Sequence, residues 1–436
     1  MNKNYYLLLL LCVISPVFAQ NAEISRIAES EMKTASALME MAVNPHTANY
    51  DVTYQKLEFT VNPNFYNITG KVTTTFKALA NMSTVTFDMS NQLTVSSVKS
   101  GTATLSFVQN SSDELVITLP STLATGATGI VEINYSGQPD NSQDAFVRST
   151  HNGQPIIWTL SEPYGARDWW PCKQDLNDKV DSIDVFITAP SQYVSVSNGL
   201  QVGTTTSGTS KTTHYHHGFP IAAYLVAIAV SNYSVFTVQA GTAPNQFPVI
   251  NYVYPEDLSD AQSEISQTAD IMDVYETLFE TYPFSAEKYG HCQFGGGGGM
   301  EHQTVSFMDG FDRQLIAHEL GHQWFGDKVT CGSWKDIWLN EGFATYLAAL
   351  IYENLDGIDT FITWKANVID YITSQSGGAV YLTDTETNDV NRIFSSRLTY
   401  DKGAMVLEML RWKLGDANFF QGVREYLDDP ALAYKY

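Results

Sequence analysis

The stretch His318-Glu319-Leu320-Gly321-His322, followed later in the chain by Glu341, decides the organisation of this protein. On a helix, residues four apart lie on one face, one turn from each other, so the two imidazoles can bind one metal ion. Glu341 can supply a third ligand, which leaves a fourth position open to water, as in catalytic zinc sites. Glu319 lies where a general base could take a proton from that water.

The sequence around this motif predicts two helices that would hold these residues together. Residues 314–324 have apolar side chains at helical spacing and no proline, and a polar loop follows at residues 326–333. Residues 338–350 are typical of a second, buried helix that carries Glu341 near its start. Two antiparallel helices with a short connection would place Glu341 opposite the histidines. An isolated HExxH also occurs by chance, so the metal prediction depends on this context.

Four segments of the chain resemble the M1 family of zinc aminopeptidases. The first is HExxH with its distant glutamate, within WLNEGFA. Gly298-Gly299-Met300-Glu301-His302 resembles the GxMEN exopeptidase signature, with His302 where the family has Asn. Residues 166–172 (ARDWWPC) resemble an element of the family's N-terminal domain, and residues 399–404 (TYDKGA) resemble its YxKGA element. The segments occur in the family's order, and the resemblance covers residues 50–436.

This resemblance implies a fold and a set of roles. The implied fold is an N-terminal all-β domain with a saddle-like sheet, followed by a thermolysin-like α/β, mostly helical catalytic domain. The active site would lie in the cleft between them. One Zn²⁺ per chain would be held by His318, His322 and Glu341.

The other implied roles concern the substrate. Glu301, together with Glu162, would bind the α-amine of a peptide through charge-assisted hydrogen bonds. Taken alone, Glu162 is better explained as a solvated loop carboxylate, and the Gly295–Gly299 run can be a flexible loop. Glu319 would act as general base, and Tyr400 would donate a hydrogen bond to the oxyanion. The backbone of the peptide would be contacted by Gly298, Gly299 and Met300.

The predicted function is therefore that of a zinc metallopeptidase. It would hydrolyse the N-terminal bond of peptides with a free N-terminus, by zinc-activated water with Glu319 as general base. Three alternatives stay open: a zinc endopeptidase, an epoxide hydrolase of the same fold, and a non-catalytic peptide-binding relative. An endopeptidase would not need Glu301 to hold an amine, and a non-catalytic relative would typically have lost a zinc ligand or the base.

The N-terminal half of the chain shows β patterning. Three segments show a period of two: Leu57, Phe59 and Val61 alternate with polar residues, as do Val72, Thr74 and Phe76, and then Val85, Phe87 and Met89. We predict a helical leader over residues 20–45, a β domain over 46–250 and the peptidase domain over 251–436. That last domain is expected to continue beyond residue 436. The histidine-rich residues 211–217 (KTTHYHH) could form a second metal site, but an alternating strand is the preferred interpretation.

The N-terminus predicts export. A basic start at residues 1–3, an apolar run over 5–15 and a small-residue cleavage site at 17–19 form a signal peptide. The protein is then expected in the periplasm or outside the cell. The net charge of −23 disfavours nucleic acids and anionic membranes as partners, and no later apolar run is long enough for membrane insertion.

The sequence leaves two properties unassigned: the side-chain preference of the site and the oligomeric state. Three cysteines follow the signal peptide, an odd number that gives no disulfide framework. A Cys292–Cys331 bridge is one option but not the expected one.

Overall fold

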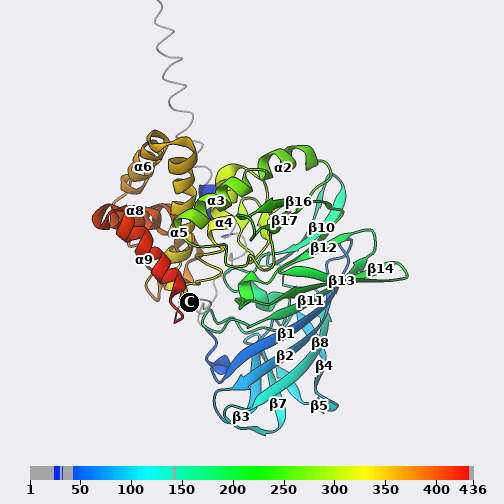
Figure 1. Cartoon of the computed structure of the whole chain (residues 1–436). Helices are drawn as coiled ribbons and strands as arrows, with labels where there is room; N and C mark the ends of the chain where they lie inside the picture. The colour runs from blue at the N-terminus through cyan, green and yellow to red at the C-terminus, as the bar shows by residue number, and fades with distance from the viewer. Residues whose placement is uncertain (1–23, 30–31, 33–42, 141–143, 432–436) are drawn as a thin grey trace, which may run out of the picture.

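The computed structural model describes residues 24–29, 32, 43–140 and 144–431, with strands in the N-terminal half and helices towards the C-terminus (Figure 1). The signal peptide predicted over residues 1–19 lies outside the described residues, as does most of the predicted leader. Residues 24–29 of that leader are helical, and Ile27 and Ala28 are buried. In the described part of the chain, no helix combines the length and apolarity needed to cross a bilayer.

Three sheets build the N-terminal domain. The largest has eight strands in the order β13 (Leu200–Ser207), β14 (Ser210–His217), β11 (Ile183–Pro190), β1 (Tyr50–Val61), β2 (Ile68–Ala78), β8 (Thr128–Gly137), β4 (Leu93–Ser100) and β5 (Ala103–Leu105). A three-stranded sheet has the order β3 (Met82–Asp88), β7 (Glu114–Leu123) and β6 (Phe107–Gln109). A four-stranded sheet has the order β12 (Val194–Ser197), β15 (Ile228–Ser231), β10 (Gln154–Thr159) and β9 (Phe146–His151).

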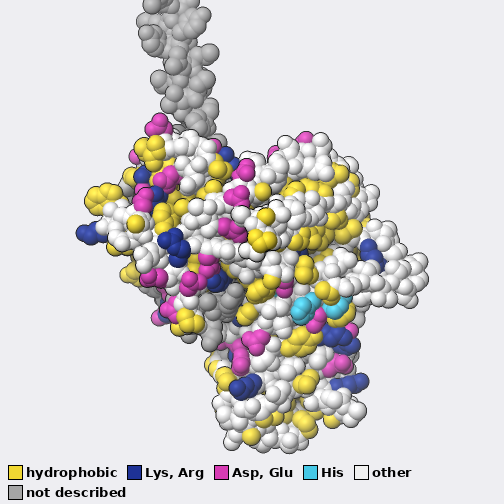
Figure 2. Space-filling view, viewed as in Figure 1, with side chains coloured by type: hydrophobic (Ala, Val, Ile, Leu, Met, Phe, Trp, Pro, Cys, Tyr) yellow, Lys and Arg dark blue, Asp and Glu magenta, His cyan; other side chains and the backbone are white. Residues whose placement is uncertain are grey.

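The predicted alternation is confirmed in β1 and β2, whereas in β3 residues 85–88 are all buried. The predicted inward residues of β1 and β2 are all buried, because successive residues of a strand point to opposite faces and one face packs on the core. Val85 and Phe87 of β3 are buried as well, and so is Met89, which follows that strand. The other face of the large sheet is partly exposed. Histidine side chains lie at the surface of the β domain beside basic and acidic side chains (Figure 2).

The second domain combines one mixed sheet with helices. The sheet has the order β16 (Ser234–Ala240), β17 (Phe247–Val253), β18 (Tyr289–Gln293), β20 (Ser306–Met308) and β19 (Gly299–Met300). The boundary predicted at residue 250 falls inside β17, and by strand pairing this domain begins at β16. The predicted order, a β domain followed by a mixed α/β catalytic domain, is confirmed.

The α-helices of this domain follow β17 in the sequence. They are α2 (Leu258–Ile265), α3 (Thr268–Leu278), α4 (Arg313–Gly321), α5 (Trp338–Ile351), α6 (Ile358–Thr373), α7 (Val390–Ile393), α8 (Lys402–Leu414) and α9 (Asp416–Asp428). There are two π-helical turns: η5 (Tyr352–Asp356) directly precedes α6, and η7 (Ser396–Asp401) directly precedes α8. Short 3₁₀ turns are η1 (Pro45–Thr47), η2 (Gly165–Asp168), η3 (Ala223–Leu225), η4 (Trp334–Asp336) and η6 (Glu386–Asn388).

Buried polar contacts join the two domains near the glycine-rich loop. Nδ1 of His217, at the end of β14, lies 2.6 Å from a carboxylate oxygen of Glu287, and its Nε2 lies 2.7 Å from Nε2 of Gln303. Gln303 comes two residues after Glu301. The β domain therefore supports the segment on which the predicted amine-binding carboxylate lies.

Candidate active site

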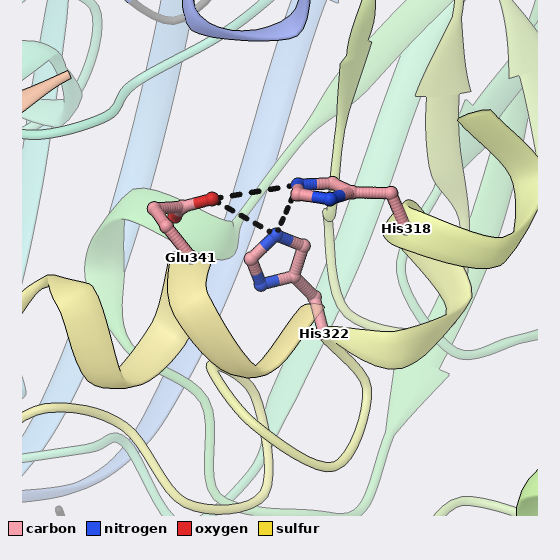
Figure 3. A group of neighbouring side chains, drawn as sticks. All are labelled: His318, His322 and Glu341. Atoms are coloured by element: carbon pink, nitrogen blue, oxygen red, sulfur yellow. Dashed lines mark hydrogen bonds and ion pairs between the residues drawn. The ribbon is translucent and has the colours of Figure 1, made fainter. Parts of the chain in front are cut away.

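Helices α4 and α5 bring the three predicted metal ligands together. Asp312 caps α4 by accepting a hydrogen bond from the Leu315 amide at 3.1 Å, which fixes where the helix begins. Oε2 of Glu341, on α5, lies 3.4 Å from Nε2 of His318 and 3.2 Å from Nε2 of His322. The two Nε2 atoms are 3.0 Å apart, and all three side chains are fully buried and converge on one point (Figure 3).

This arrangement fits a zinc ion. With bonds of about 2.0–2.1 Å at tetrahedral angles, ligand atoms lie about 3.3 Å apart, which matches the observed spacing. Nδ1 of His322 lies 3.1 Å from the Phe325 carbonyl, to which it can donate a hydrogen bond, leaving the Nε2 lone pair free for a metal. Burial alone would raise the pKa of Glu341, but its interactions with His322 and His318 outweigh burial and lower this pKa to about 2, so the carboxylate stays ionised. An anionic ligand and two facing imidazole nitrogens need a cation between them.

Glu319 lies beside this centre in a confined position. It is fully buried, and its carboxylate oxygens have no hydrogen-bond partner among the described residues. Burial, more than any other cause, raises the pKa of Glu319 well above its ordinary value. A carboxylate with a raised pKa holds a proton more readily, as a general base must. The backbone of Gly299 is so close that a Cβ atom there would lie 2.1 Å from Oε1 of Glu319.

A second acidic group adjoins the metal ligands. One carboxylate oxygen from each of Glu162, Glu301 and Glu341 lies within 4.8 Å of the others, and all three residues are buried. The solvated-loop interpretation of Glu162 is therefore excluded. Burial raises the pKa of both Glu162 and Glu301, and the mutual proximity of the carboxylates adds to the shift of Glu162. Buried carboxylates at this spacing favour binding of a positively charged group.

Tyr224 belongs to this acidic group but carries no signal in the sequence. Its hydroxyl donates a hydrogen bond of 3.3 Å to Oε1 of Glu301. The chain has 24 tyrosines, and nothing in the local pattern distinguishes this one. On the other side, Nε2 of Gln323 donates to the Glu301 carbonyl at 3.1 Å, which ties the glutamate to the end of α4.

Comparison with known proteins decides the family. Residues 46–225 match the Peptidase M1 N-terminal domain, and residues 300–435 match the Peptidase family M1 domain. The chain belongs to peptidase family M1. The second match includes the metal ligands, Glu301 and Tyr400.

Relatives of this M1 chain include longer animal enzymes and a bacterial one of similar size. It is 27% identical over 341 residues to endoplasmic reticulum aminopeptidase 2 of Bos taurus, covering 72% of this chain and 35% of that protein. It is 27% identical over 328 residues to human glutamyl aminopeptidase, covering 69% and 34%. The chain thus spans about a third of these relatives' length.

Solved structures extend the likeness to the fold. The M1 zinc metallopeptidase of Deinococcus radiodurans superimposes with a TM-score of 0.77 at 25% identity, covering 89% of this chain and 88% of that one. A mutant of that enzyme bound to a Tyr-Ser-Ala substrate gives a TM-score of 0.76 at 25% identity, with the same coverage of both chains.

The M1 signature residues 298–300 form an edge of the catalytic sheet. In β19, Gly299 pairs with Met308 and Met300 with Phe307 of β20, and the Gly298 carbonyl accepts from the Asp309 amide at 2.9 Å. Because β19 ends the strand order, no strand of the described residues pairs with its other side. An extended peptide could add there as a further strand.

Tyr400 lies in η7, beside the metal ligand His318. Its ring is fully buried and nearly parallel to that of His318, with centroids 6.1 Å apart. A close helix contact brings this segment in: a Cβ atom on Gly403 would lie 3.0 Å from Cα of Gly342, the residue after Glu341. Two glycines therefore let η7 and α8 approach α5, and the position of Tyr400 follows from that approach.

Other residues of the M1 motifs have packing roles. His302 is fully buried, its ring lies edge-on to Phe307 with centroids 4.4 Å apart, and burial lowers its pKa to about 3, so it is neutral. Asn340, next to the Glu341 ligand, accepts a hydrogen bond of 3.0 Å from the Cys331 amide and so holds the loop between α4 and α5. Cys292 and Cys331 are both free thiols, so the bridge between them is not formed.

Proposed function

We propose that this chain is a zinc-dependent aminopeptidase that releases the N-terminal residue of peptides. The observation that carries the proposal is the juxtaposition of two sites in one buried space. One holds a metal through His318, His322 and Glu341, and the other places Glu301 and Glu162 beside it. The first supports peptide hydrolysis, and the second supports capture of a free α-ammonium group at a fixed distance from the reacting bond.

The residues divide the reaction between them. When bound, zinc would act as a Lewis acid and lower the pKa of a water molecule. Glu319 accepts a proton from the attacking water and returns it to the leaving amine. Tyr400 donates a hydrogen bond to the carbonyl oxygen of the substrate as negative charge develops there. Glu301 and Glu162 accept charge-assisted hydrogen bonds from the α-ammonium group.

Zinc binding and base catalysis are separable in one variant. Glu319→Gln keeps the shape of the side chain but cannot accept a proton. We expect it to bind zinc in the wild-type amount and to lose about 10²–10⁴-fold in kcat. Zinc content by elemental analysis and turnover of amino-acyl anilides test this, and a variant that kept high activity would contradict the role of Glu319.

A pair of substrates tests the amine requirement. The peptide Tyr-Ser-Ala and its N-acetylated form differ only in the charged N-terminus, and their common product Ser-Ala can be followed by chromatography. We expect cleavage of the free peptide alone, and a raised KM for it in Glu301→Gln. Equal cleavage of both forms would instead indicate an endopeptidase. A zinc-loaded protein with no turnover of peptides or epoxides would indicate a binding module.

We also infer that the protein is exported to the periplasm or beyond the cell. This inference rests on the composition of residues 1–19. Mass spectrometry of the protein isolated from its source should find a mature N-terminus at Gln20. Recovery of the intact Met1 form from the cytoplasm would contradict export.

A further inference from the structure

The chain makes a tight turn directly after Glu301, and this turn contains a strained residue. The Val305 amide donates a hydrogen bond of 2.8 Å to the His302 carbonyl, which closes the turn. Thr304, the third residue of the turn, has a φ of 71°. Glycine or asparagine usually occupies such a position, because a β-branched side chain is strained in the left-handed region. Strain of this kind persists only where surrounding contacts enforce it, and it gathers at functional sites.

Three separate segments hold Thr304 in this conformation. Its amide donates a hydrogen bond of 2.8 Å to Oε1 of Gln323, at the end of α4. Its hydroxyl accepts one of 2.8 Å from the Gly199 amide, in the loop between β12 and β13. Its carbonyl accepts one of 3.1 Å from Nζ of Lys288, which directly precedes β18. All four residues are buried, so each of these contacts is made away from water.

The Gln323 side chain holds the backbone at both ends of the segment from Glu301 to Thr304. While Oε1 accepts from the Thr304 amide, Nε2 donates to the Glu301 carbonyl at 3.1 Å. Gln323 directly follows the metal ligand His322 at the end of α4 (Figure 3). One amide group therefore joins the helix that carries two metal ligands to the segment that carries the amine-binding carboxylate.

The β domain holds the same segment from another direction. Nδ2 of Asn198 donates to the Gln303 carbonyl at 2.8 Å and to the Leu225 carbonyl at 2.9 Å. Tyr224, the residue before Leu225, donates its hydroxyl to Oε1 of Glu301. The backbone and the carboxylate of Glu301 are thus both fixed by buried hydrogen bonds.

We propose that Gln323 and Thr304 are positioning residues for the aminopeptidase reaction. They hold the Glu301 carboxylate at a set distance from the metal ligands, so that a bound α-ammonium group brings the first peptide bond to the metal. This role rests on the proposed function. The strain at Thr304 fits it, because glycine at this position would remove the strain but also the hydroxyl that binds the Gly199 amide.

Gln323→Met tests the proposal, because it keeps the length of the side chain and removes both of its hydrogen bonds to the segment. We expect KM for Tyr-Ser-Ala to rise about 10-fold, since loss of one hydrogen bond weakens binding by up to about this factor. The change in kcat should be smaller, and zinc content by elemental analysis should match the wild type.

Gln293→Met is the matched control. The Gln293 amide also accepts from a backbone N–H, that of Tyr254 at 2.8 Å, and donates to a second partner, Oδ2 of Asp257 at 2.7 Å. Both partners lie outside residues 301–304. We expect this variant to lower Tm, as loss of buried hydrogen bonds does, and to keep the wild-type KM.

A double-mutant cycle separates positioning from general support of the fold. A residue that acts through Glu301 has little left to affect once that carboxylate is removed. In the Glu301→Gln background, Gln323→Met should therefore raise KM by less than about 2-fold. A purely structural role would raise KM by the same factor in both backgrounds.

Two variants of Thr304 test the other half of the clamp. Thr304→Val keeps the β-branched shape but removes the hydroxyl, so KM for Tyr-Ser-Ala should rise. Thr304→Ser keeps the hydroxyl and should retain the wild-type KM. This pair leaves Gln323 in place, so it decides the question even if Gln323→Met does not fold.

Several outcomes would overturn the proposal. These are an unchanged KM in Gln323→Met, an equal rise of KM in both backgrounds, loss of zinc from Gln323→Met, and equal KM in Thr304→Val and Thr304→Ser. Failure of the proposed function would be seen separately, in the wild type, as equal cleavage of Tyr-Ser-Ala and its N-acetylated form.

Discussion

The contact between Gly299 and Glu319 predicts a variant that keeps the fold but loses activity. An ideal Cβ at position 299 lies 2.1 Å from Oε1 and 2.4 Å from Cδ of Glu319, where ordinary contact begins at 3.4 Å. Gly299→Ala therefore requires the carboxylate to retreat by about 1.3 Å. Gly299 is not among the residues with positive φ, so alanine suits its backbone. Because the displaced atoms end a flexible side chain, we expect stability to change little.

The kinetic cost follows from the displacement. A misplacement of about 1 Å can reduce a rate about 100-fold, and complete loss of a general base costs about 10²–10⁴-fold. We therefore expect kcat of Gly299→Ala to fall about 100-fold, with a smaller change in KM because Glu301 and Glu162 are not displaced. Turnover of an amino-acyl anilide, zinc content and Tm are measured together.

Gly295→Ala is the matched control for this variant. It lies in the same glycine-rich loop, but a Cβ atom there meets nothing within 4 Å. We expect it to retain wild-type kcat. Equal kcat in Gly299→Ala and Gly295→Ala would refute the reasoning, since Glu319 would then not be confined by the backbone of β19. Loss of zinc from Gly299→Ala would also refute it, because the defect would lie in the metal ligands.

Three further perturbations test other parts of the structure. Gly403→Ala places a Cβ 3.0 Å from Cα of Gly342, so it should lower stability by about 1–3 kcal/mol and reduce kcat by moving Tyr400, as thermal unfolding and kinetics would reveal. His217→Ala removes the partner of the buried Glu287 carboxylate and should cost about 3–5 kcal/mol near neutral pH, measured by urea unfolding. Burial raises the pKa of Glu287, but the hydrogen bond and charge of His217 outweigh burial and hold this pKa below its usual value of 4.5. The stabilisation by the ionised carboxylate is therefore complete above pH 4.5 and is lost as the pH falls through the lowered pKa. The free energies of unfolding of wild type and variant should converge in acid. Chelation of the metal should lower Tm and abolish turnover, and added Zn²⁺ should restore both.

The metal centre could be predicted from the sequence because its geometry is local. The helical period alone places His318 and His322 on one face. The segment 322–337, which contains η4, brings the second helix back alongside the first. The structure places α4 at Arg313–Gly321 and α5 at Trp338–Ile351, close to the predicted helices. The β strands were predictable for a similar reason, since a sheet with one buried face imposes alternation on each strand.

The remaining features depend on contacts between residues distant in sequence. Tyr224 meets Glu301 across 77 positions, and no local pattern reports such a meeting. The approach of Gly342 to Gly403 likewise depends on how two helices cross. The predicted domain boundary at residue 250 follows the β patterning of the sequence. However, β17 pairs with β18 rather than with the β domain, and alternation within a strand does not show which strand it pairs with.

The concentration of buried acids explains why such a site would select charged N-termini. Glu162, Glu301, Glu319 and Glu341 are all fully buried, and burial opposes ionisation of each. Carboxylates in such a space are stabilised by cations, and the metal ligands provide for one of these. One carboxylate oxygen of Glu301 and one of Glu162 lie within 4.8 Å of a carboxylate oxygen of Glu341, so a positive group is favoured beside them. A free α-ammonium group supplies that charge, whereas an acetylated N-terminus would be desolvated there without supplying any. The proposed preference for exopeptidase cleavage would thus follow from this concentration of buried carboxylates, and it should disappear in a variant that neutralises both Glu301 and Glu162.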